Sequence, residues 1–264
     1  MLVYSKTSMT TQIIAIANQK GGVGKTTTTI SLAAALAKMK QRVLCVDLDP
    51  QAALTASTVG EETGAAATLY EVLGGYSELA DAIVPFKEGF DVAVGSVHLS
   101  GAEIELAQVE ERHSQIARML KGIDYEIVLI DCPPSLGMLA VNALTAAQWV
   151  LIPVAAEFLA LRGLAMLIDA IERVQEGLNP DLKILGILPT LYESRTLHAK
   201  EVVGALRERF EKLVFRMPVK RTVRFRETPI VQSSILSYAP ESEGAKAYTK
   251  LAKEVMERVK ARIT

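Results

Sequence analysis

The chain has 264 residues, half of them apolar, which is enough for a large core and typical of one α/β domain. Its net charge of -1 gives no overall electrostatic field that would favour a strongly charged partner. No apolar run reaches the length of about 18 residues that a membrane-spanning helix needs. Cys45 and Cys132 are too few for a disulfide framework or a zinc site, and we expect both to be buried small hydrophobes. A reducing cytoplasm fits this cysteine usage.

The predicted elements alternate between short β-rich runs and longer helical patterns. Residues 1–11 show no regular pattern and are interpreted as a loose lead-in to a single domain over residues 12–264. The predicted strands are Gln12–Ala17, Arg42–Val46, Phe90–Val94, Ile127–Ile130, Trp149–Pro153 and Ile184–Leu188, with a further short one near Leu213–Met217. The predicted helices are Thr27–Met39, Ala102–Leu120, Leu161–Glu176, Ala199–Glu211 and Glu243–Arg262. This alternation predicts an α/β fold with a mainly parallel, doubly wound sheet and helices on both faces.

A glycine-rich loop joins the first predicted strand to the first predicted helix. It reads Lys20-Gly21-Gly22-Val23-Gly24-Lys25-Thr26-Thr27, in the strand–loop–helix setting of a P-loop NTPase. The backbone N–H groups of such a loop and the helix N-terminus form a phosphate site. We expect Lys25 to contact the β- and γ-phosphates, Thr26 to hold Mg²⁺ and Thr27 to approach the α-phosphate. The sequence therefore predicts a site for ATP and Mg²⁺.

The loop departs from the general P-loop pattern, because Gln19 stands where the pattern has its first glycine, and the next residue is a second lysine, Lys20. A second lysine in the loop has no clear role if one nucleotide on one subunit is the whole site. It has a role if Lys20 contacts phosphate across a dimer interface. The alternative is a solvated loop lysine.

Carboxylates follow two further predicted strands. Asp47 and Asp49 come after the second strand, and Asp131 ends the fourth. Ligands of open α/β sheets bind at this carboxyl edge. We expect Asp131, through water, and Asp47 to help hold Mg²⁺, and Asp49 to orient the attacking water. Capping of a turn or helix is the alternative role for the Asp47–Asp49 pair.

A basic stretch lies near the end of the chain. Between residues 212 and 226 there are six cations and no acidic residue: Lys212, Arg216, Lys220, Arg221, Arg224 and Arg226. Arg195 and Lys200 precede it. Such a surface suits a nucleic-acid phosphate backbone, although a solvated charged face is the alternative. Because the net charge is -1, the chain must be acidic elsewhere.

Several segments together resemble the ParA/Soj partition ATPases, which carry a deviant P-loop and belong to the MinD/ParA superfamily. Besides the loop with Lys20, they are Asp47-Leu48-Asp49-Pro50-Gln51, Asp131-Cys132-Pro133-Pro134, Leu161-Arg162-Gly163-Leu164 and Thr222-Val223-Arg224-Phe225-Arg226-Glu227-Thr228-Pro229. The likeness covers almost the whole chain after residue 11. It is to the short form of the family.

The resemblance implies a slow ATPase that closes as a homodimer around two nucleotides and then binds double-stranded DNA without sequence preference. A ParB-like partner would stimulate hydrolysis and release the protein, which would be cytoplasmic and nucleoid-associated without stable membrane association. The catalytic residues implied are Lys20 as the intersubunit lysine, Lys25 and Asp49. The resemblance assigns DNA contacts to Arg195 and Arg224, with Lys200, Arg221 and Arg226 as further candidates. It also assigns nucleotide contacts to Lys220 and Thr222, which stand where the family's Pro-Arg-Asn pattern is altered.

Three other functions remain open from the sequence. A MinD-like membrane ATPase is one, but it would need a basic amphipathic tail after the last predicted helix, and we find none. On that helix an apolar stripe suits either a membrane surface or, as we expect, the core, because the polar face mixes acidic side chains with lysines and arginines; the stripe consists of Leu251, Val255, Val259 and Ile263. A metabolic ligase of the dethiobiotin synthetase type is another. The third is a non-enzymatic DNA-coating protein, against which the intact Asp49 and Asp131 argue.

Overall fold

The computed structural model describes residues 11–157 and 160–263, and within them one seven-stranded sheet forms the centre of the molecule. Its strands are β1 (Gln12–Ile16), β2 (Val43–Asp47), β3 (Ile83–Phe86), β4 (Phe90–Ala93), β5 (Ile127–Asp131), β6 (Trp149–Ala155) and β7 (Lys183–Thr190). Their order across the sheet is β3-β4-β2-β5-β1-β6-β7. Every described pairing is parallel except that of β3 with β4. The predicted mainly parallel, doubly wound sheet is confirmed.

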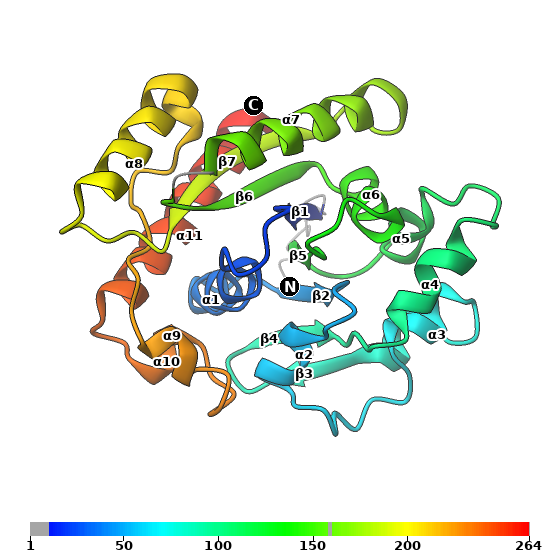
Figure 1. Cartoon of the computed structure of the whole chain (residues 1–264). Helices are drawn as coiled ribbons and strands as arrows, with labels where there is room; N and C mark the ends of the chain where they lie inside the picture. Colours follow the sequence, from blue (N-terminus) through cyan, green and yellow to red (C-terminus); the bar gives the residue numbers. More distant parts are fainter. Residues whose placement is uncertain (1–10, 158–159, 264) are drawn as a thin grey trace, which may run out of the picture.

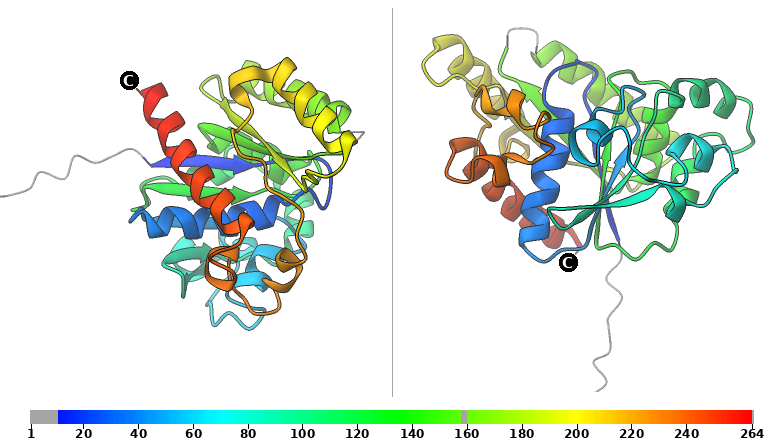
Figure 2. Two further views of the ribbon diagram at one scale, coloured as in Figure 1. Left: turned by 90° about the vertical axis from the view of Figure 1, so that its left-hand side faces the viewer. Right: turned by 90° about the horizontal axis from the view of Figure 1, so that it is seen from below.

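Helices cover both faces of the sheet (Figures 1 and 2). They are α1 (Lys25–Lys38), α2 (Ala53–Thr58), α3 (Leu69–Leu73), α4 (Leu99–Leu106), α5 (Gln115–Met119), α6 (Met138–Ala146), α7 (Ala160–Gly177), α8 (Leu197–Phe210), α9 (Arg224–Glu227), α10 (Ile235–Tyr238) and α11 (Glu243–Ile263), with short 3₁₀ turns η1 (Leu79–Ala82) and η2 (Glu211–Leu213). Apolar residues of α1, α10 and α11 pack in the cluster on one face, and those of α4 to α7 in the cluster on the other.

The central strands are apolar throughout because both of their faces are covered. Along β1, Ile14 and Ile16 belong to one core cluster, whereas Ile13 and Ala15 belong to the other, as the two-residue period of a strand requires. Cys45 and Cys132 are free and fully buried, as predicted.

Two predicted elements are wrong. The single helix expected over Ala102–Leu120 is two helices, α4 and α5, because Glu111 turns the chain at a positive φ of 54° and Asn142 of α6 caps the new helix through its Oδ1, which accepts from Gln115 N at 2.9 Å. The strand expected near Leu213–Met217 is a 3₁₀ turn followed by a single bridge between Val214 and Ile187. The short antiparallel edge strand β3, which contains a proline, was not predicted.

The apolar stripe of α11 faces the core. Leu251, Val255 and Val259 are at most 3% exposed, while the side chain of Ile263 lies outside the described residues. The stripe therefore packs inside the protein, as the core-facing alternative predicted. In residues 11–157 and 160–263 no helix has the length and apolar character that crossing a membrane would require.

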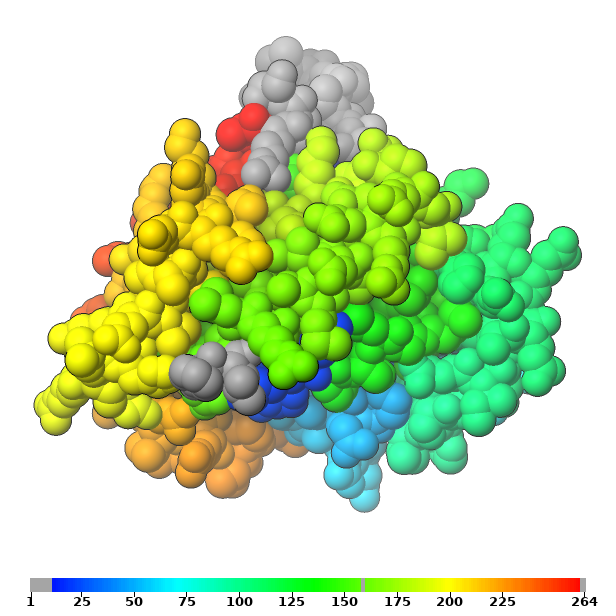
Figure 3. All heavy atoms as spheres, turned by 45° about the horizontal axis from the view of Figure 1, so that its top comes forward, coloured from blue at the N-terminus to red at the C-terminus, as the bar shows by residue number. Residues whose placement is uncertain are grey.

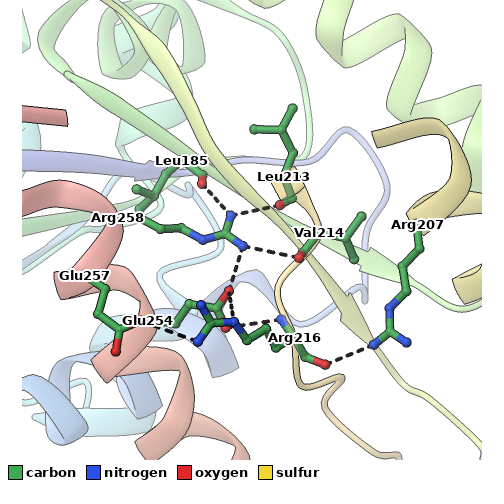
Figure 4. Close-up of polar contacts among 8 residues, drawn as sticks. All are labelled: Leu185, Arg207, Leu213, Val214, Arg216, Glu254, Glu257 and Arg258. Carbon is green, nitrogen blue, oxygen red and sulfur yellow. Dashed lines mark hydrogen bonds and ion pairs between the residues drawn. The ribbon is translucent and has the colours of Figure 1, made fainter. Parts of the chain in front are cut away.

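A largely buried arginine, Arg258, fixes the segment that follows α8. Arg258 of α11 donates to the carbonyl oxygens of Leu185, Leu213 and Val214 at 2.8, 3.0 and 3.2 Å, and to the carboxylate of Glu254 at 2.7 Å (Figure 4). These bonds take the carbonyls that a strand at 213–217 would need. They hold the chain just before it enters the site described next.

Candidate nucleotide site

The glycine-rich loop between β1 and α1 has the backbone of an anion site. Gly22 and Gly24 have φ angles of 73° and 91°, a region that side chains other than glycine rarely adopt. Gly24 caps α1 without any side-chain hydrogen bond, so the first N–H groups of the helix stay available for an anion. Lys25 begins the helix and is only 7% exposed. In the space-filling view, dark-blue atoms from the start of the chain reach the surface next to light-blue, green and orange segments (Figure 3).

Two neighbouring strands hold this loop in place. Asn18 donates from Nδ2 to the Pro153 carbonyl of β6 at 2.6 Å, and its Oδ1 accepts from Lys20 N at 2.9 Å. Thr190 at the end of β7 donates to the Val23 carbonyl at 2.7 Å. Sequence reasoning missed Asn18 and Thr190, because their role depends on strands that are distant in the chain.

The carboxylates predicted for the metal meet at the same edge. Asp47 and Asp131 are opposite each other in the β2–β5 register, and both are fully buried. Thr26 donates to Asp131 Oδ2 at 2.6 Å, and Thr29 to its Oδ1 at 3.3 Å. Thr55 donates to Asp47 Oδ2 twice, from its backbone N at 2.8 Å and its hydroxyl at 2.7 Å.

The donor set fits Mg²⁺. Asp47 Oδ1 is buried and has no hydrogen-bond partner among the described residues, so it can accept from a metal-bound water. The described part of the chain has no group of three or more His, Cys, Asp or Glu side chains placed to hold a metal. Mg²⁺ here would therefore take the Thr26 hydroxyl, phosphate oxygens and waters held by Asp131 and Asp47, a ligand set typical of this ion.

The pKa shifts of the two buried carboxyl groups also favour a cation at this site. Burial is the main cause that raises the pKa of Asp131, the Asp47 charge adds to it, and Thr26 and Lys25 oppose it. Burial also raises the pKa of Asp47, against the two hydrogen bonds from Thr55. Two adjacent buried carboxylates are costly to ionise together, and a divalent cation relieves that cost.

We expect Asp131→Asn to stabilise the protein without nucleotide and Mg²⁺. A carboxylate whose folded pKa is raised stabilises the fold below its unfolded pKa of about 4, and this contribution is lost as pH rises through the folded pKa. The melting temperature should therefore rise most at alkaline pH, by about 2 to 4 °C for each kcal/mol of repulsion removed. Thermal melts in EDTA across pH test this. Asp124→Asn, at an 85% exposed side chain, is the control, and an equal shift in both variants would contradict the prediction.

Asp49 lies two residues beyond β2, with its Oδ1 accepting from Gln51 N at 3.0 Å. Its charge contributes to the raised pKa values of both Asp47 and Asp131, so it lies near them. The structure thus brings together the loop and the three carboxylates that the sequence singled out. The catalytic role of Asp49 stays a prediction.

A cavity of about 390 Å³ opens beside the loop. Its lining includes Gly22, Gly24 and Thr27 on one side and residues 219–222, Phe225, Arg226 and Tyr248 on the other. The rings of Phe225 and Tyr248 meet edge to face at 6.0 Å between centroids, which provides an apolar end suited to a base. Lys220 and Thr222 line this cavity, and their contact with the nucleotide stays a prediction. The sequence analysis did not identify Phe225 or Tyr248 as residues of the cavity. The position of Phe225 inside the segment 222–229 could have indicated Phe225, whereas no sequence signal indicated Tyr248.

A chain of ion pairs crosses the mouth of this cavity. Lys20 pairs with Glu157, which also contacts Arg221 at 3.3 Å, and Arg221 contacts Glu193 at 2.9 Å. Lys20 is the main cause that lowers the pKa of Glu157. The side chains of Lys20, Glu157 and Arg221 are each between 43 and 48% exposed. Lys20 thus lies at the surface and is paired with a residue of the cavity lining. Glu157 is a further functional candidate that the sequence did not reveal.

The residues predicted to bind DNA separate into two groups. Arg195, Lys200 and Arg224 are exposed, at the turn before α8, on α8 and on α9. Arg221 and Arg226 are exposed as well, but they also line the cavity beside the loop. DNA contact remains a prediction for all five, and the second pair is equally placed to meet the nucleotide.

Comparison with known proteins agrees with this geometry. A family described as an AAA domain matches residues 11–184. The chromosome-partitioning ATPase Soj of Thermus thermophilus is 46% identical over 247 residues, which are 93% of this chain and 96% of that protein. The chromosome partitioning protein ParA of Caulobacter vibrioides is 43% identical over 256 residues, covering 95% and 96% of the two chains.

A solved structure is similar over nearly the whole length. It is described as cobyrinic acid a,c-diamide synthase from Mycobacterium smegmatis with bound ADP and magnesium, and it is 41% identical with a TM-score of 0.83, covering 95% of this chain and 96% of that one. ATP and Mg²⁺ are accordingly the cofactors of the site built by the loop and Asp131. The chain therefore belongs to the ParA/Soj-type P-loop ATPases.

Proposed function

We propose that this protein is an ATP-driven DNA-segregation switch associated with the nucleoid in the cytoplasm. Mg-ATP binding closes a homodimer around two nucleotides, and the dimer binds double-stranded DNA without sequence preference. Hydrolysis, which is slow until a ParB-like partner stimulates it, opens the dimer and releases the DNA. The names of the Soj and ParA relatives support this proposal.

The observation that carries the proposal is the contrast between the two lysines of the loop. Lys25 is buried inside the site, whereas the Lys20 side chain is 48% exposed and paired with the exposed Glu157. A surface lysine that is paired with a residue of the cavity lining can reach the nucleotide of a second subunit. There it would act as a charge supplied in trans.

The other residues supply positioning. Thr26 and Asp131 hold the Mg²⁺ shell, and the bound ion neutralises charge that develops on the phosphates. Lys25 binds the phosphates from within the loop. Asp49 orients the attacking water at the carboxyl end of β2.

DNA binding with ATP, with ADP and without nucleotide, each at two salt concentrations, tests the proposal. We expect affinity for a non-specific duplex only with ATP, and a steep loss with salt, because backbone contacts release counterions. Binding that is equal in all three nucleotide states, or absent from all, would contradict the switch.

We expect Arg195→Glu and Arg224→Glu each to weaken DNA binding by at least about tenfold while the ATP-dependent dimer survives, because both side chains are exposed and neither lines the cavity beside the loop. Fluorescence anisotropy with labelled duplex measures the first effect and analytical ultracentrifugation the second. Arg173→Glu, an exposed arginine of α7, makes the same charge change as a control. Unchanged, salt-dependent affinity in both variants would refute the assignment.

We expect Glu157→Gln to speed ATP-dependent dimerisation by up to about fivefold, because it frees Lys20 from an exposed ion pair of the same subunit, worth at most about 1 kcal/mol. Stopped-flow light scattering after ATP addition measures the rate. Glu193→Gln removes another carboxylate bound to Arg221 and leaves Lys20 paired, so it is the control. A slower rate in Glu157→Gln would show that this carboxylate assists closure instead.

A second candidate function is ATP-dependent amidation, which the name of the Mycobacterium smegmatis neighbour favours. It predicts turnover of ATP that requires a carboxylate substrate and an ammonia donor. Phosphate release measured with cobyrinic acid and glutamine, against release with DNA, separates the two functions. Turnover stimulated by the first pair would favour the ligase.

A further inference from the structure

The charges of this nearly neutral chain are separated in space. Residues 51–111 contain eleven acidic side chains and one basic one, whereas residues 195–226 contain ten basic and three acidic ones. Helices α3 and α4 of the acidic part and helices α8 and α9 of the basic part lie on opposite sides of the molecule (Figure 1). The acidic side therefore repels nucleic acid and anionic lipid and attracts cationic groups.

A cleft lies on the acidic side between α3, α4 and α5. It consists of two adjoining hollows of about 620 and 450 Å³, which share Leu73, Gly75, Tyr76 and Gln115. We call it the α3–α5 cleft. Ala102, Leu106 and Val109 give the smaller hollow an apolar wall. The cleft is thus long enough to take several side chains of an extended or helical segment.

Apolar side chains stand exposed along this cleft. Tyr76, which lines both hollows, is 76% exposed, and Val109, which lines the smaller one, is 46% exposed. Gly75, at a φ of 75°, shapes the turn that presents Tyr76, and a side chain on Gly74 would collide with the tyrosine ring. An exposed aromatic side chain that lines a hollow is the kind of anchor that carries binding energy in protein interfaces.

The charges around the cleft complement a cation. Glu78 lines the larger hollow, Glu105 the smaller one, and Glu110 lies in the turn whose carbonyl accepts from Gln115. Arg118 also lines the larger hollow, but it is paired with Glu111, which leaves Lys121 as the other cation of that lining. Exposed apolar anchors inside an acidic rim match an amphipathic segment with a basic face.

We propose that the α3–α5 cleft is the docking site for a basic, amphipathic peptide segment of a protein partner. The segment places apolar side chains against Tyr76 and Val109 and its lysines or arginines near Glu78, Glu105 and Glu110. Since the cleft is on the side away from α8 and α9, the partner binds without competing for those helices. The inference goes beyond the proposed function and holds whether or not the protein binds DNA.

The test uses the full chain and a labelled amphipathic lysine–leucine peptide, with a glutamate–leucine peptide of the same pattern as its counterpart. We expect saturable binding of the first peptide only. The double variant Tyr76→Ser/Val109→Ser should bind it at least about tenfold more weakly, the loss expected for removing interface anchors. Glu78→Lys/Glu110→Lys, at two exposed surface positions, should weaken it similarly without disturbing the core. Leu197→Ser, at a 71% exposed leucine of α8, should leave it unchanged.

ATP binding by each variant, measured in parallel, shows that the fold is retained and keeps the outcome separate from the ATPase proposal. The proposal is overturned if the wild type shows no saturable binding, or if Leu197→Ser weakens binding as much as the cleft variants. It is also overturned if Tyr76→Ser/Val109→Ser lowers the oligomeric mass of the protein without peptide, since the cleft would then be an interface between two copies of this chain.

Discussion

Lys20→Ala is expected to lower the rate of ATP hydrolysis by at least about 10³-fold while ATP affinity stays within about tenfold of the wild type, as befits a charge supplied in trans to the transition state. The physical reason is the position of the Lys20 side chain, which is half exposed and paired with Glu157 of the cavity lining, whereas Lys25 is buried. Phosphate release at saturating Mg-ATP measures the rate, and binding of a labelled ATP analogue measures the affinity.

Lys25→Ala is the contrasting variant. Lys25 is buried at the start of α1, so its removal takes the cation out of the site itself and is expected to abolish detectable ATP binding. Loss of binding in Lys20→Ala as well would mean that Lys20 acts within its own subunit. Wild-type turnover in Lys20→Ala would refute the catalytic role.

Mixed dimers test the trans arrangement directly. A Lys20→Ala subunit keeps its own Asp49, and an Asp49→Ala subunit keeps its own Lys20. If Lys20 acts across the interface, the mixture regains activity at the nucleotide held by the Lys20→Ala subunit. If it acts within one subunit, neither site of the mixed dimer is complete and no activity returns.

Arg258→Met is expected to lower the free energy of unfolding by about 3 to 5 kcal/mol, the range for removing one partner of a buried ion pair. The Arg258 side chain is 16% exposed and its guanidinium lies over the Phe215 ring at 4.1 Å. Its loss leaves the Glu254 carboxylate, 7% exposed, and three backbone carbonyls without this donor (Figure 4). Equilibrium urea unfolding measures the change.

Arg216→Met is the matched control. Arg216 contacts Glu254 and Glu257 at 4.0 and 3.5 Å, but its side chain is 80% exposed, so we expect a loss below about 1 kcal/mol. Equal losses in the two variants would show that the buried hydrogen bonds of Arg258 contribute little. Because Arg258 holds the segment that leads to residues 219–222 of the cavity, its variant should also bind ATP more weakly.

The sequence by itself determined the elements whose signal is local. The strand–loop–helix around Lys25 was predictable because glycines, a lysine and two threonines at fixed spacing satisfy a phosphate through adjacent backbone. Asp47 and Asp131 were predictable because each ends an apolar strand, and parallel strands end at a common edge. Both cysteines and the stripe of α11 followed from apolar periodicity alone.

Only the tertiary structure decided the contacts between distant segments. The break between α4 and α5 depends on Asn142, and the loss of the strand at 213–217 depends on Arg258, each far along the chain. The pairing of Lys20 with Glu157 arises in the same way, and so does the place of the exposed Arg221 and Arg226 in the lining of the cavity. Such contacts produce no periodic pattern in the sequence, because the two side chains come within bonding distance only after the sheet has brought their segments together.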